Sequence, residues 1–449
     1  IKMKSWLIQG GRLIDPGQKL DEVGNLLITE GKISWLGSGK ESPPHPNYST
    51  LPAHGLIVCP GFIDLHCHLR ESYLEEKETI ATGTQAAARG GFTTICCMPN
   101  TNPPLDNAPA IDYVRTKAKT EGVVRVLPIG CISTDRQGKK LTQLGELASA
   151  GAFGFSDDGL PVLDAELMRQ ALEWSRTSGL PIINHCEDTT LTAGGVINEG
   201  RISLALGLPG MPAMAEETMI ERDLKLAERT GGWLHLAHIS TAGGVELIRQ
   251  AKMKNIRVTA EVTPHHLTLT EERVIECGTQ AKVNPPLRTQ QDISALIRGL
   301  NEGVIDIIAT DHAPHTKTDK RSDLTRAAFG ISGLETTLGS LMGLVHRGQL
   351  TLTTLITKLT SEPARILDHR YGQLGTLAID SPADITIFDP EKDWLVDLKT
   401  FASKGKNTPW AGFVLKGKVM ATIYGGKMVY IDESGTTKTK MQETMTKFK

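Results

Sequence analysis

The sequence predicts an α/β protein, a (β/α)8 TIM-like barrel with a small β-sandwich domain built from both chain ends. In the middle of the chain, apolar runs of strand length alternate eight times with helical segments, which is typical of a parallel barrel. The two ends instead carry short strands broken by turn residues. With 449 residues, the chain is long enough for one barrel-sized domain and a smaller one.

The expected domain boundaries follow this change in pattern. Residues 1–54 form the first part of the sandwich, 55–368 the barrel, and 369–432 the second part of the sandwich. Residues 433–449 have no apolar period, so we expect a flexible tail there. The sandwich strands are expected at 5–9, 12–14, 25–29, 32–36, 383–388, 412–415, 418–424 and 427–431.

The barrel elements are predicted from apolar runs and helical periodicity. Its eight strands are expected at 56–65, 93–98, 124–129, 152–155, 181–184, 233–237, 257–262 and 304–310. Helices between them are expected, among others, at 78–89, 165–177, 216–228, 244–254 and 293–301.

Composition excludes several classes of protein. Lysine and arginine number 49 against 51 aspartates and glutamates, and there is no basic block, so nucleic acid is not an expected partner. No run approaches the roughly 18 apolar residues of a membrane span. Seven scattered cysteines without a Cys-x-x-Cys pair indicate reduced thiols, so we expect a cytoplasmic protein.

The most informative stretch is 56–71, Leu-Ile-Val-Cys-Pro-Gly-Phe-Ile-Asp-Leu-His-Cys-His-Leu-Arg-Glu. An apolar run ends there in His66 and His68, with Arg70 two residues further on. Side chains two residues apart lie on the same side of a strand. Two neutral imidazoles on one side suit a divalent transition metal such as zinc, and the guanidinium can bind a carboxylate. Alone, the motif could also be a surface strand that happens to carry two histidines.

More polar residues follow the later apolar runs, where the catalytic groups of a barrel lie. These are Asp157 and Asp158, His185, His238 and Asp311. Each alone is more often a cap or a satisfied polar group, but four histidines and two aspartates at one barrel mouth predict a metal centre with two ions. His235 is expected to face away from that centre. His265 and His266 are expected beside the ligands rather than among them.

Four phrases in order resemble the amidohydrolase superfamily, and within it the dihydroorotases of the long-chain bacterial class I type. The first is the His-x-His stretch, which alone marks only the superfamily. Met98 to Pro103, Met-Pro-Asn-Thr-Asn-Pro, and Arg70 are more specific to the dihydroorotases. The remaining phrases are Asp-His-Ala-Pro-His from Asp311 and Phe-Gly-Ile-Ser-Gly-Leu-Glu from Phe329.

The resemblance implies a set of metal ligands. His66 and His68 would hold one metal, His185 and His238 a second, and an acidic group would bridge them. Many relatives bridge with a carboxylated lysine, but no lysine lies between Lys140 and Lys225. The bridge would then be an aspartate, for which the spacing to His185 favours Asp158, with Asp157 as the alternate. Asp311 would bind the first metal and carry the proton. Zinc is the preferred metal, with two ions expected per chain, although manganese or cobalt would fit.

The resemblance also implies an activity, the reversible cyclisation of N-carbamoyl-L-aspartate to L-dihydroorotate plus water in pyrimidine (UMP) biosynthesis. Metal-activated hydroxide would attack the ring amide, with Asp311 as general acid and base. The substrate-binding residues would be His68, Arg70, Asn100, Asn284, His315, Phe329 and Gly330. The expected partners are this small-molecule substrate, a second copy of the chain and aspartate transcarbamoylase.

Two departures from the family pattern concern loops. Ser72 and Tyr73 follow Glu71 where the family commonly has Pro-Gly, and Ala328 stands where a proline often precedes Phe-Gly. Other interpretations are an allantoinase or hydantoinase, which usually carry the bridging lysine, and a weakly active or silent partner of aspartate transcarbamoylase. A nucleotide-binding protein is disfavoured because no complete phosphate loop is present.

Overall fold

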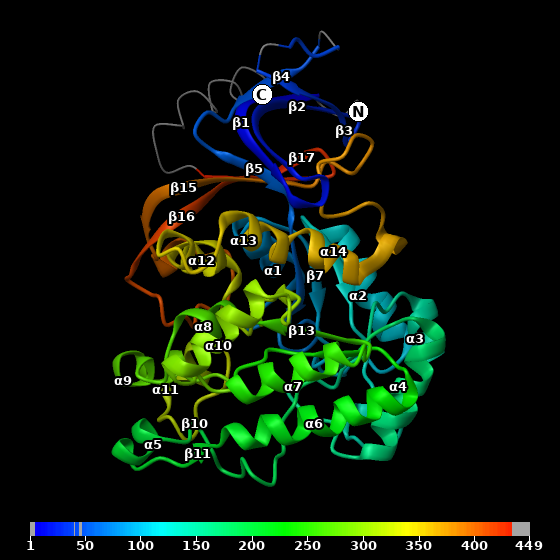
Figure 1. The fold of residues 1–449 in the computed structure, drawn as a ribbon, viewed down its shortest axis with the longest axis vertical. Coiled ribbons are helices and arrows are strands. Elements are labelled where there is room, and N and C mark those ends of the chain that lie inside the picture. Colours follow the sequence, from blue (N-terminus) through cyan, green and yellow to red (C-terminus); the bar gives the residue numbers. More distant parts are fainter. Residues whose placement is uncertain (1–4, 40, 45–46, 433–449) are drawn as a thin grey trace.

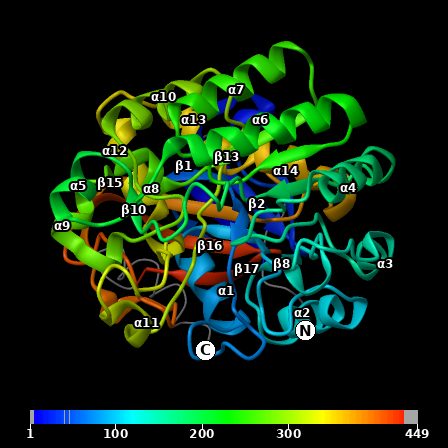
Figure 2. The same ribbon diagram turned by 90° about the horizontal axis from the view of Figure 1, so that it is seen from below.

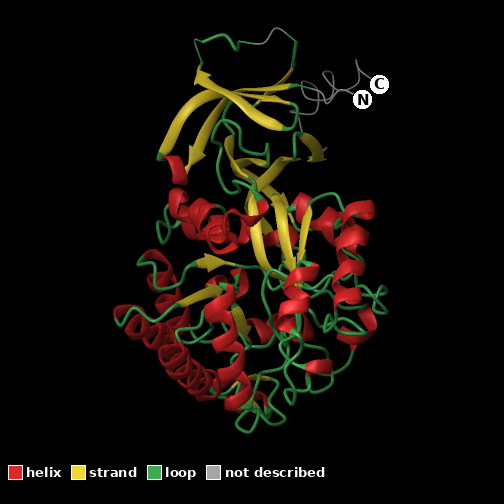
Figure 3. Ribbon diagram, turned by 90° about the vertical axis from the view of Figure 1, so that its right-hand side faces the viewer, coloured by secondary structure: helices red, strands yellow, loops and turns green. Residues whose placement is uncertain are grey.

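The computed structural model describes residues 5–39, 41–44 and 47–432. Its strands gather in two places, a sheet at one end of the molecule and a helix-wrapped barrel below it (Figures 1 and 3). The first and last strands, β1 (Trp6–Asp15) and β17 (Lys427–Ile431), both lie in the upper sheet. The predicted tail 433–449 lies outside the described residues.

The upper sheet combines both chain ends, as predicted. Its strand order is β17-β16-β15-β5-β1-β2-β3, with β4 pairing β1. β5 (Ile57–Pro60) joins the two ends, because it pairs with β1 on one side and with β15 on the other. Its other strands are β2 (Leu20–Thr29), β3 (Lys32–Ser38), β4 (Ser49–Pro52), β15 (Ile385–Leu395) and β16 (Val414–Tyr424). Side chains from both ends, including Ile8, Leu26, Ile385 and Ile423, pack into one apolar core.

The barrel strands form two parallel groups, β6-β7-β8 and β9-β12-β13-β14. They are β6 (Phe62–Cys67), β7 (Phe92–Cys97), β8 (Arg125–Pro128), β9 (Ile182–Asn184), β12 (Leu234–Leu236), β13 (Val258–Val262) and β14 (Ile307–Ile308). Isolated parallel bridges close the ring: Phe155 connects Gly130 to Ile182, and Cys67 pairs with His312. A short parallel pair, β10 (Ile197–Asn198) and β11 (Gly210–Met211), lies outside the ring.

Several strand predictions are wrong in detail: the predicted strands 5–9 and 12–14 are the single strand β1, those at 412–415 and 418–424 are the single strand β16, and two barrel strands also differ. The predicted strand 152–155 is reduced to the single bridging residue Phe155. The predicted strand 56–65 is two strands, β5 in the upper sheet and β6 in the barrel, which meet at Gly61. A side chain at Gly61 would overlap Thr93, so the chain passes between the two layers at a point where only glycine fits. Periodicity could not reveal this break because both halves are apolar and fully buried.

Helices surround the barrel strands (Figure 2). The predicted helices agree with the observed ones to within three residues at each end. The helices are α1 (Ile80–Arg89), α2 (Ala108–Glu121), α3 (Leu144–Ala150), α4 (Ala165–Ser178), α5 (Arg201–Leu206), α6 (Ala213–Thr230), α7 (Ala242–Met253), α8 (Pro264–Thr268), α9 (Arg273–Cys277), α10 (Gln290–Asn301), α11 (Lys317–Arg321), α12 (Thr337–His346), α13 (Leu352–Leu359) and α14 (Ser361–Leu367).

Local chemistry fixes where these helices begin and end. α4 starts at the N-cap Asp164, whose carboxylate accepts hydrogen bonds from two backbone N–H groups, and stops at the left-handed Gly179. α10 starts at a capping box formed by Thr289 and Asp292. The longer helices, among them α1, α4, α6, α7 and α10, then turn an apolar face onto the strands. Within the described part of the chain, no helix has the length and apolar character needed to cross a membrane.

Candidate metal centre

The end of β6 presents two histidines to the barrel mouth. Ile63 and Leu65 pack inside the barrel, whereas Cys67 packs in the outer layer between strands and helices. The pairing with β7 shifts register between Asp64 and Cys67. Such a bulge re-aims the side chains that follow it. His66 and His68 therefore reach the mouth although the residues before them alternate in the opposite phase.

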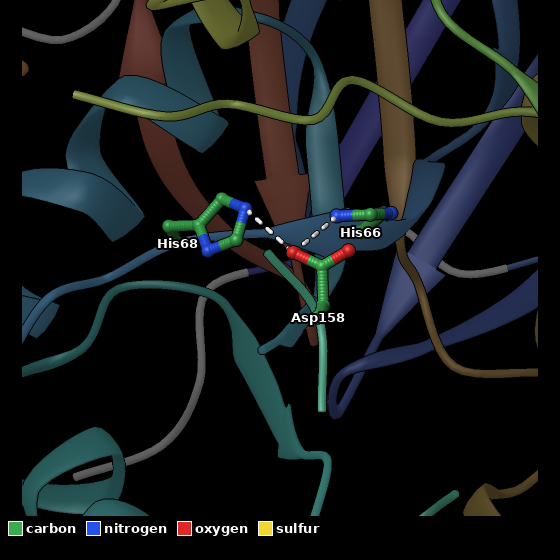
Figure 4. Close-up of side chains that lie close together, drawn as sticks. All are labelled: His66, His68 and Asp158. Atoms are coloured by element: carbon green, nitrogen blue, oxygen red, sulfur yellow. Dashed lines mark ion pairs between the residues drawn. The ribbon is translucent and has the colours of Figure 1, made fainter. Parts of the chain in front are cut away.

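Asp158 lies between these two histidines and a second pair. Its Oδ2 atom is 3.5 Å from Nε2 of His66 and 3.5 Å from Nε2 of His68 (Figure 4). Its Oδ1 atom is 3.4 Å from Nε2 of His238 and 3.8 Å from Nδ1 of His185. One carboxylate thus faces two histidine pairs, one with each oxygen.

The four histidines and Asp158 form two groups whose donor atoms lie close enough to hold a metal ion. The groups are His66, His68 and Asp158, and Asp158, His185 and His238. All five side chains are buried. His66 Nε2 and Asp158 Oδ1 have no hydrogen-bond partner. Because unpaired buried polar atoms are costly, and because imidazole nitrogen and carboxylate oxygen are ligands that zinc and related ions prefer, this donor set fits a divalent cation in each group.

Asp311 completes the first group from the end of β14. Its Oδ1 atom is 3.1 Å from Nε2 of His68 and 3.5 Å from Nε2 of His66. Asp311 and His238 both have positive φ, 45° and 34°, which costs a residue other than glycine about 1–3 kcal/mol. The surrounding packing holds two strand-end residues in this conformation with their side chains at the mouth.

The charges of the site keep both carboxylates ionised. Burial alone would raise the pKa of Asp158, but the charge of His66 and the close approach of His238 outweigh burial and hold that pKa well below its usual value. For Asp311 too, burial alone would raise the pKa. The contact with His68 and the charges of the nearby histidines outweigh burial and lower it. Burial and the nearby Arg70 lower the pKa of His68, which favours the neutral, metal-binding form.

The choice between Asp157 and Asp158 is visible in the hydrogen bonds. Asp157 Oδ1 accepts from the backbone N–H groups of Ile132 and Ser133, both at 3.0 Å, and Oδ2 accepts from the Ser133 hydroxyl. Its carboxylate is therefore occupied in holding the loop after β8. Asp158 is the aspartate that faces the histidines.

Glu261 is a residue that the sequence interpretation missed. Its Oε1 atom lies 2.5 Å from Nδ1 of His66 and accepts from the backbone N–H of His238 at 3.2 Å. Its Oε2 atom is 3.1 Å from Nε2 of His235. His235, expected to be structural, thus contacts the carboxylate oxygen of Glu261 that does not contact His66. A single acidic residue within the apolar strand β13 was the signal for this role.

We expect Glu261→Gln to weaken metal binding by about 10- to 100-fold, because the carboxylate that orients a ligating histidine sets its tautomer and basicity. Metal content after dialysis against a graded series of chelator concentrations measures the change. Thr259→Val is the matched control, since Thr259 Oγ1 contacts His235 Nδ1 at 2.8 Å and lies one step further from His66. Equal metal retention by Glu261→Gln and the wild type would contradict this role.

Glu187 is the second residue that was missed, although it directly follows the His-Cys pair. Its Oε2 atom is 2.9 Å from Nε2 of His185 and accepts from Nδ2 of Asn284 at 2.8 Å. Burial alone would raise the pKa of Glu187, but His185 lowers it to about 2.

His266 bonds to Thr263 and to the Pro285 carbonyl, and His265 is buried beside the centre without a bond to a ligand. Both agree with the expected place next to the ligands.

A cavity of about 170 Å³ opens onto the centre. It is lined by every predicted site residue except His66, namely His68, Arg70, Asn100, Asp158, His185, His238, Asn284, Asp311, His315, Phe329 and Gly330, together with Gly159, Val283 and Ala313. Asn100 Oδ1 lies 2.8 Å from Nδ1 of His68 and so orients that ring. Arg70 and His315 form one wall of the cavity, and Asp319, which does not line it, has its Oδ2 atom 3.6 Å from Nδ1 of His315.

Arg70 and His315 make that wall cationic but not doubly charged. Arg70 Nη2 lies 3.4 Å from Nε2 of His315. Burial lowers the pKa of Arg70 to about 10, so the guanidinium stays charged at neutral pH. Burial and the charge of Arg70 lower the pKa of His315 to about 3, so this imidazole is neutral there. One fixed positive charge and a neutral hydrogen-bonding ring suit a single carboxylate.

Comparisons with known proteins agree with this architecture. The family described as Dihydro-orotase-like matches residues 55–243. The chain is 48% identical over 427 residues to the dihydroorotase of Syntrophus aciditrophicus (strain SB), covering 95% of this chain and 99% of that protein. It is 47% identical over 431 residues to the dihydroorotase of Aquifex aeolicus (strain VF5), covering 96% and 100%.

Solved structures share the whole fold. The L-hydantoinase (dihydropyrimidinase) from Arthrobacter aurescens is similar with a TM-score of 0.85 and 27% identity, over 95% of this chain and 96% of that chain. The dihydropyrimidinase from Brevibacillus agri NCHU1002 is similar with a TM-score of 0.82 and 23% identity, over 96% of each chain, and shows the fold alone. The predicted barrel with a β domain from both ends is thereby confirmed.

Proposed function

Because the chain belongs to the dihydroorotase family, we propose that its barrel mouth catalyses the reversible cyclisation of N-carbamoyl-L-aspartate to L-dihydroorotate plus water, a step towards pyrimidine nucleotides. One observation carries this proposal: Asp158 faces two histidine pairs at the base of a cavity whose wall holds Arg70 and His315. Ligands for two metal ions and a carboxylate-binding wall are what a cyclic amide with a ring carboxylate requires.

Two divalent ions, for which zinc is our choice, would be held by His66 and His68 on one side and His185 and His238 on the other, with Asp158 shared. When bound, they supply Lewis-acid polarisation of the ring carbonyl and lower the pKa of a water molecule to near neutral. The protein's part is to fix the ligands. Glu261 and Asn100 orient the first histidine pair and Glu187 orients His185, each through the ring nitrogen that it contacts.

The substrate carboxylate would bind Arg70, with Asn100 and His315 beside it. Because these groups and Asp158 line the same cavity, a carboxylate bound at Arg70 would orient the amide to be cleaved toward the metal-ligating side chains. Asn284 and the Phe329-Gly330 backbone would contact the ring edges. Gly330 has φ 138°, and a side chain there would overlap Ala313, so the backbone itself forms this wall.

Asp311 would move the proton. In the hydrolytic direction it takes a proton from the attacking water and delivers it to the departing ring nitrogen, and cyclisation uses the same transfer in reverse. Its low pKa keeps it ionised and ready to accept that proton. Its Oδ1 atom lies 3.1 Å from Nε2 of His68, at the cavity.

Other expectations concern partners and location. Association with aspartate transcarbamoylase, a homo-oligomer and a cytoplasmic location stay predictions. The family membership disfavours the allantoinase and hydantoinase interpretations, since the dihydroorotases are about 47% identical to this chain and the hydantoinase 27%.

The function is tested with the purified full chain, on which metal content and L-dihydroorotate hydrolysis are measured before and after chelation. We expect turnover that is lost with the metal and regained with zinc. Hydantoin, which has no ring carboxylate, should be hydrolysed poorly because Arg70 has no partner in it. Comparable turnover of both compounds would favour a hydantoinase, and metal without turnover until aspartate transcarbamoylase is added would favour a partner-dependent enzyme.

A further inference from the structure

A segment of the terminal domain reaches the barrel mouth. Residues 396–413 lie between the adjacent strands β15 and β16 of the upper sheet, and we refer to them as the strap. The strap leaves the sheet and packs on the loops that follow β14. Its apolar residues Val396, Phe401 and Trp410 are buried in one cluster with Ile331 and Val283 of the barrel.

Asn407 of the strap bonds to both loops that carry substrate-binding residues. Its Oδ1 atom accepts from the backbone N–H of His315 at 2.8 Å and from the hydroxyl of Ser332 at 2.9 Å. Its Nδ2 atom donates to the carbonyl oxygens of Ala313 at 3.0 Å and Gly330 at 2.9 Å. The side-chain amide has two donor hydrogens and two acceptor positions, and all four are used.

The strap backbone around Asn407 packs directly against the same two loops. A side chain at Gly405 would lie 2.5 Å from the backbone nitrogen of His315 and from Pro314 Cβ, so the strap backbone rests directly on this loop. Ser332 Oγ also lies 2.7 Å from the Gly405 carbonyl, so its one hydrogen is shared between that oxygen and Asn407 Oδ1, and the Ser332 N–H donates to the backbone carbonyl of Asn407 at 2.7 Å. Asn407 is 3% exposed, so water cannot replace its bonds without opening the strap.

These contacts add to the direct links between the two walls of the cavity, which are the bridge between His312 and Ile331 and the contact of His315 Nε2 with the Phe329 carbonyl at 2.8 Å. His315 and Gly330 are on opposite loops, and Asn407 binds the backbone of each. We propose that Asn407 is a positioning residue of the active site, which fixes the spacing of the His315 and Phe329-Gly330 loops and hence the fit of the substrate carboxylate and ring. This inference rests on the proposed function.

The test compares Asn407→Ala with the wild type in L-dihydroorotate hydrolysis, using zinc-loaded full-length protein. We expect KM to rise about 10- to 100-fold, because small misplacements of binding groups have effects of this size, while kcat changes less and metal content stays the same. Ser332→Ala, which removes one of the four contacts, should raise KM in the same direction by a smaller factor. It keeps the test valid if Asn407→Ala fails to fold.

Asn25→Ala is the matched control, since Asn25 is a buried asparagine of the upper sheet whose Oδ1 accepts from the backbone N–H of Gly10. It should lower the melting temperature without changing KM. A folded Asn407→Ala or Ser332→Ala with KM within twofold of the wild type would overturn the proposal, as would loss of metal from either. Absence of turnover by the wild type itself would count against the proposed function, and the positioning role would fall with it.

Discussion

Asp158→Ala is expected to abolish activity and to remove at least the metal ion of the His185 and His238 group. The carboxylate is shared by the two ligand groups, so its loss leaves the second group with two histidines only and the first with two histidines and the nearby Asp311. Two ligands hold a divalent ion much less tightly than three, and without metal the water is no longer acidified, so we expect a loss of at least about 10³-fold in kcat/KM. Elemental analysis and dihydroorotate hydrolysis on the same sample measure both effects.

The neighbouring residue provides the control. Asp157→Asn should keep both metals and most activity, because Asp157 faces the loop after β8 and an amide oxygen can still accept the N–H bonds of Ile132 and Ser133. Its effect should be a lower melting temperature. If instead Asp157→Asn lost the metals and Asp158→Ala kept them, the bridge would be the other aspartate and the geometry above would be wrong.

Much of the fold could be predicted because its signals are local. Helix α4 has a cap at each end and an apolar face, and its predicted range 165–177 differs from the observed one by one residue. The pairing of the two ends through β5 could be predicted only in outline. The strand that joins them continues an apolar run into β6, and periodicity does not show that the chain changes sheets at Gly61.

The ligating residues could be predicted because each ends an apolar run, and the ends of parallel strands meet at one mouth. What supports them could not be predicted in the same way. Glu261 contacts His66 across 195 positions of sequence, and Asn407 contacts His315 across 92. Such contacts depend on how distant segments pack. The bulge after Asp64, which turns His66 into the mouth, likewise depends on the pairing of β6 with β7.

Asp311→Asn is expected to lower kcat by about 10²- to 10⁴-fold, the usual contribution of a general acid and base, while leaving metal in place. The amide keeps the size of the side chain, but it cannot take up a proton. The group of His66, His68 and Asp158 remains intact in this variant. Steady-state rates in both directions, together with metal content, separate proton transfer from metal binding.

The same strand offers the control for this prediction. Asp306 precedes β14 and Asp311 follows it, so the two carboxylates lie at opposite ends of one strand. Asp306 accepts from the Ala260 N–H at 2.8 Å and pairs with Lys252 at 2.7 Å, away from the cavity. Asp306→Asn should therefore change stability but leave kcat within about twofold, as substitutions away from functional groups do. An Asp311→Asn variant as active as Asp306→Asn would mean that another group carries the proton, and the neutral His265, buried beside Asp311, would be the next residue to test.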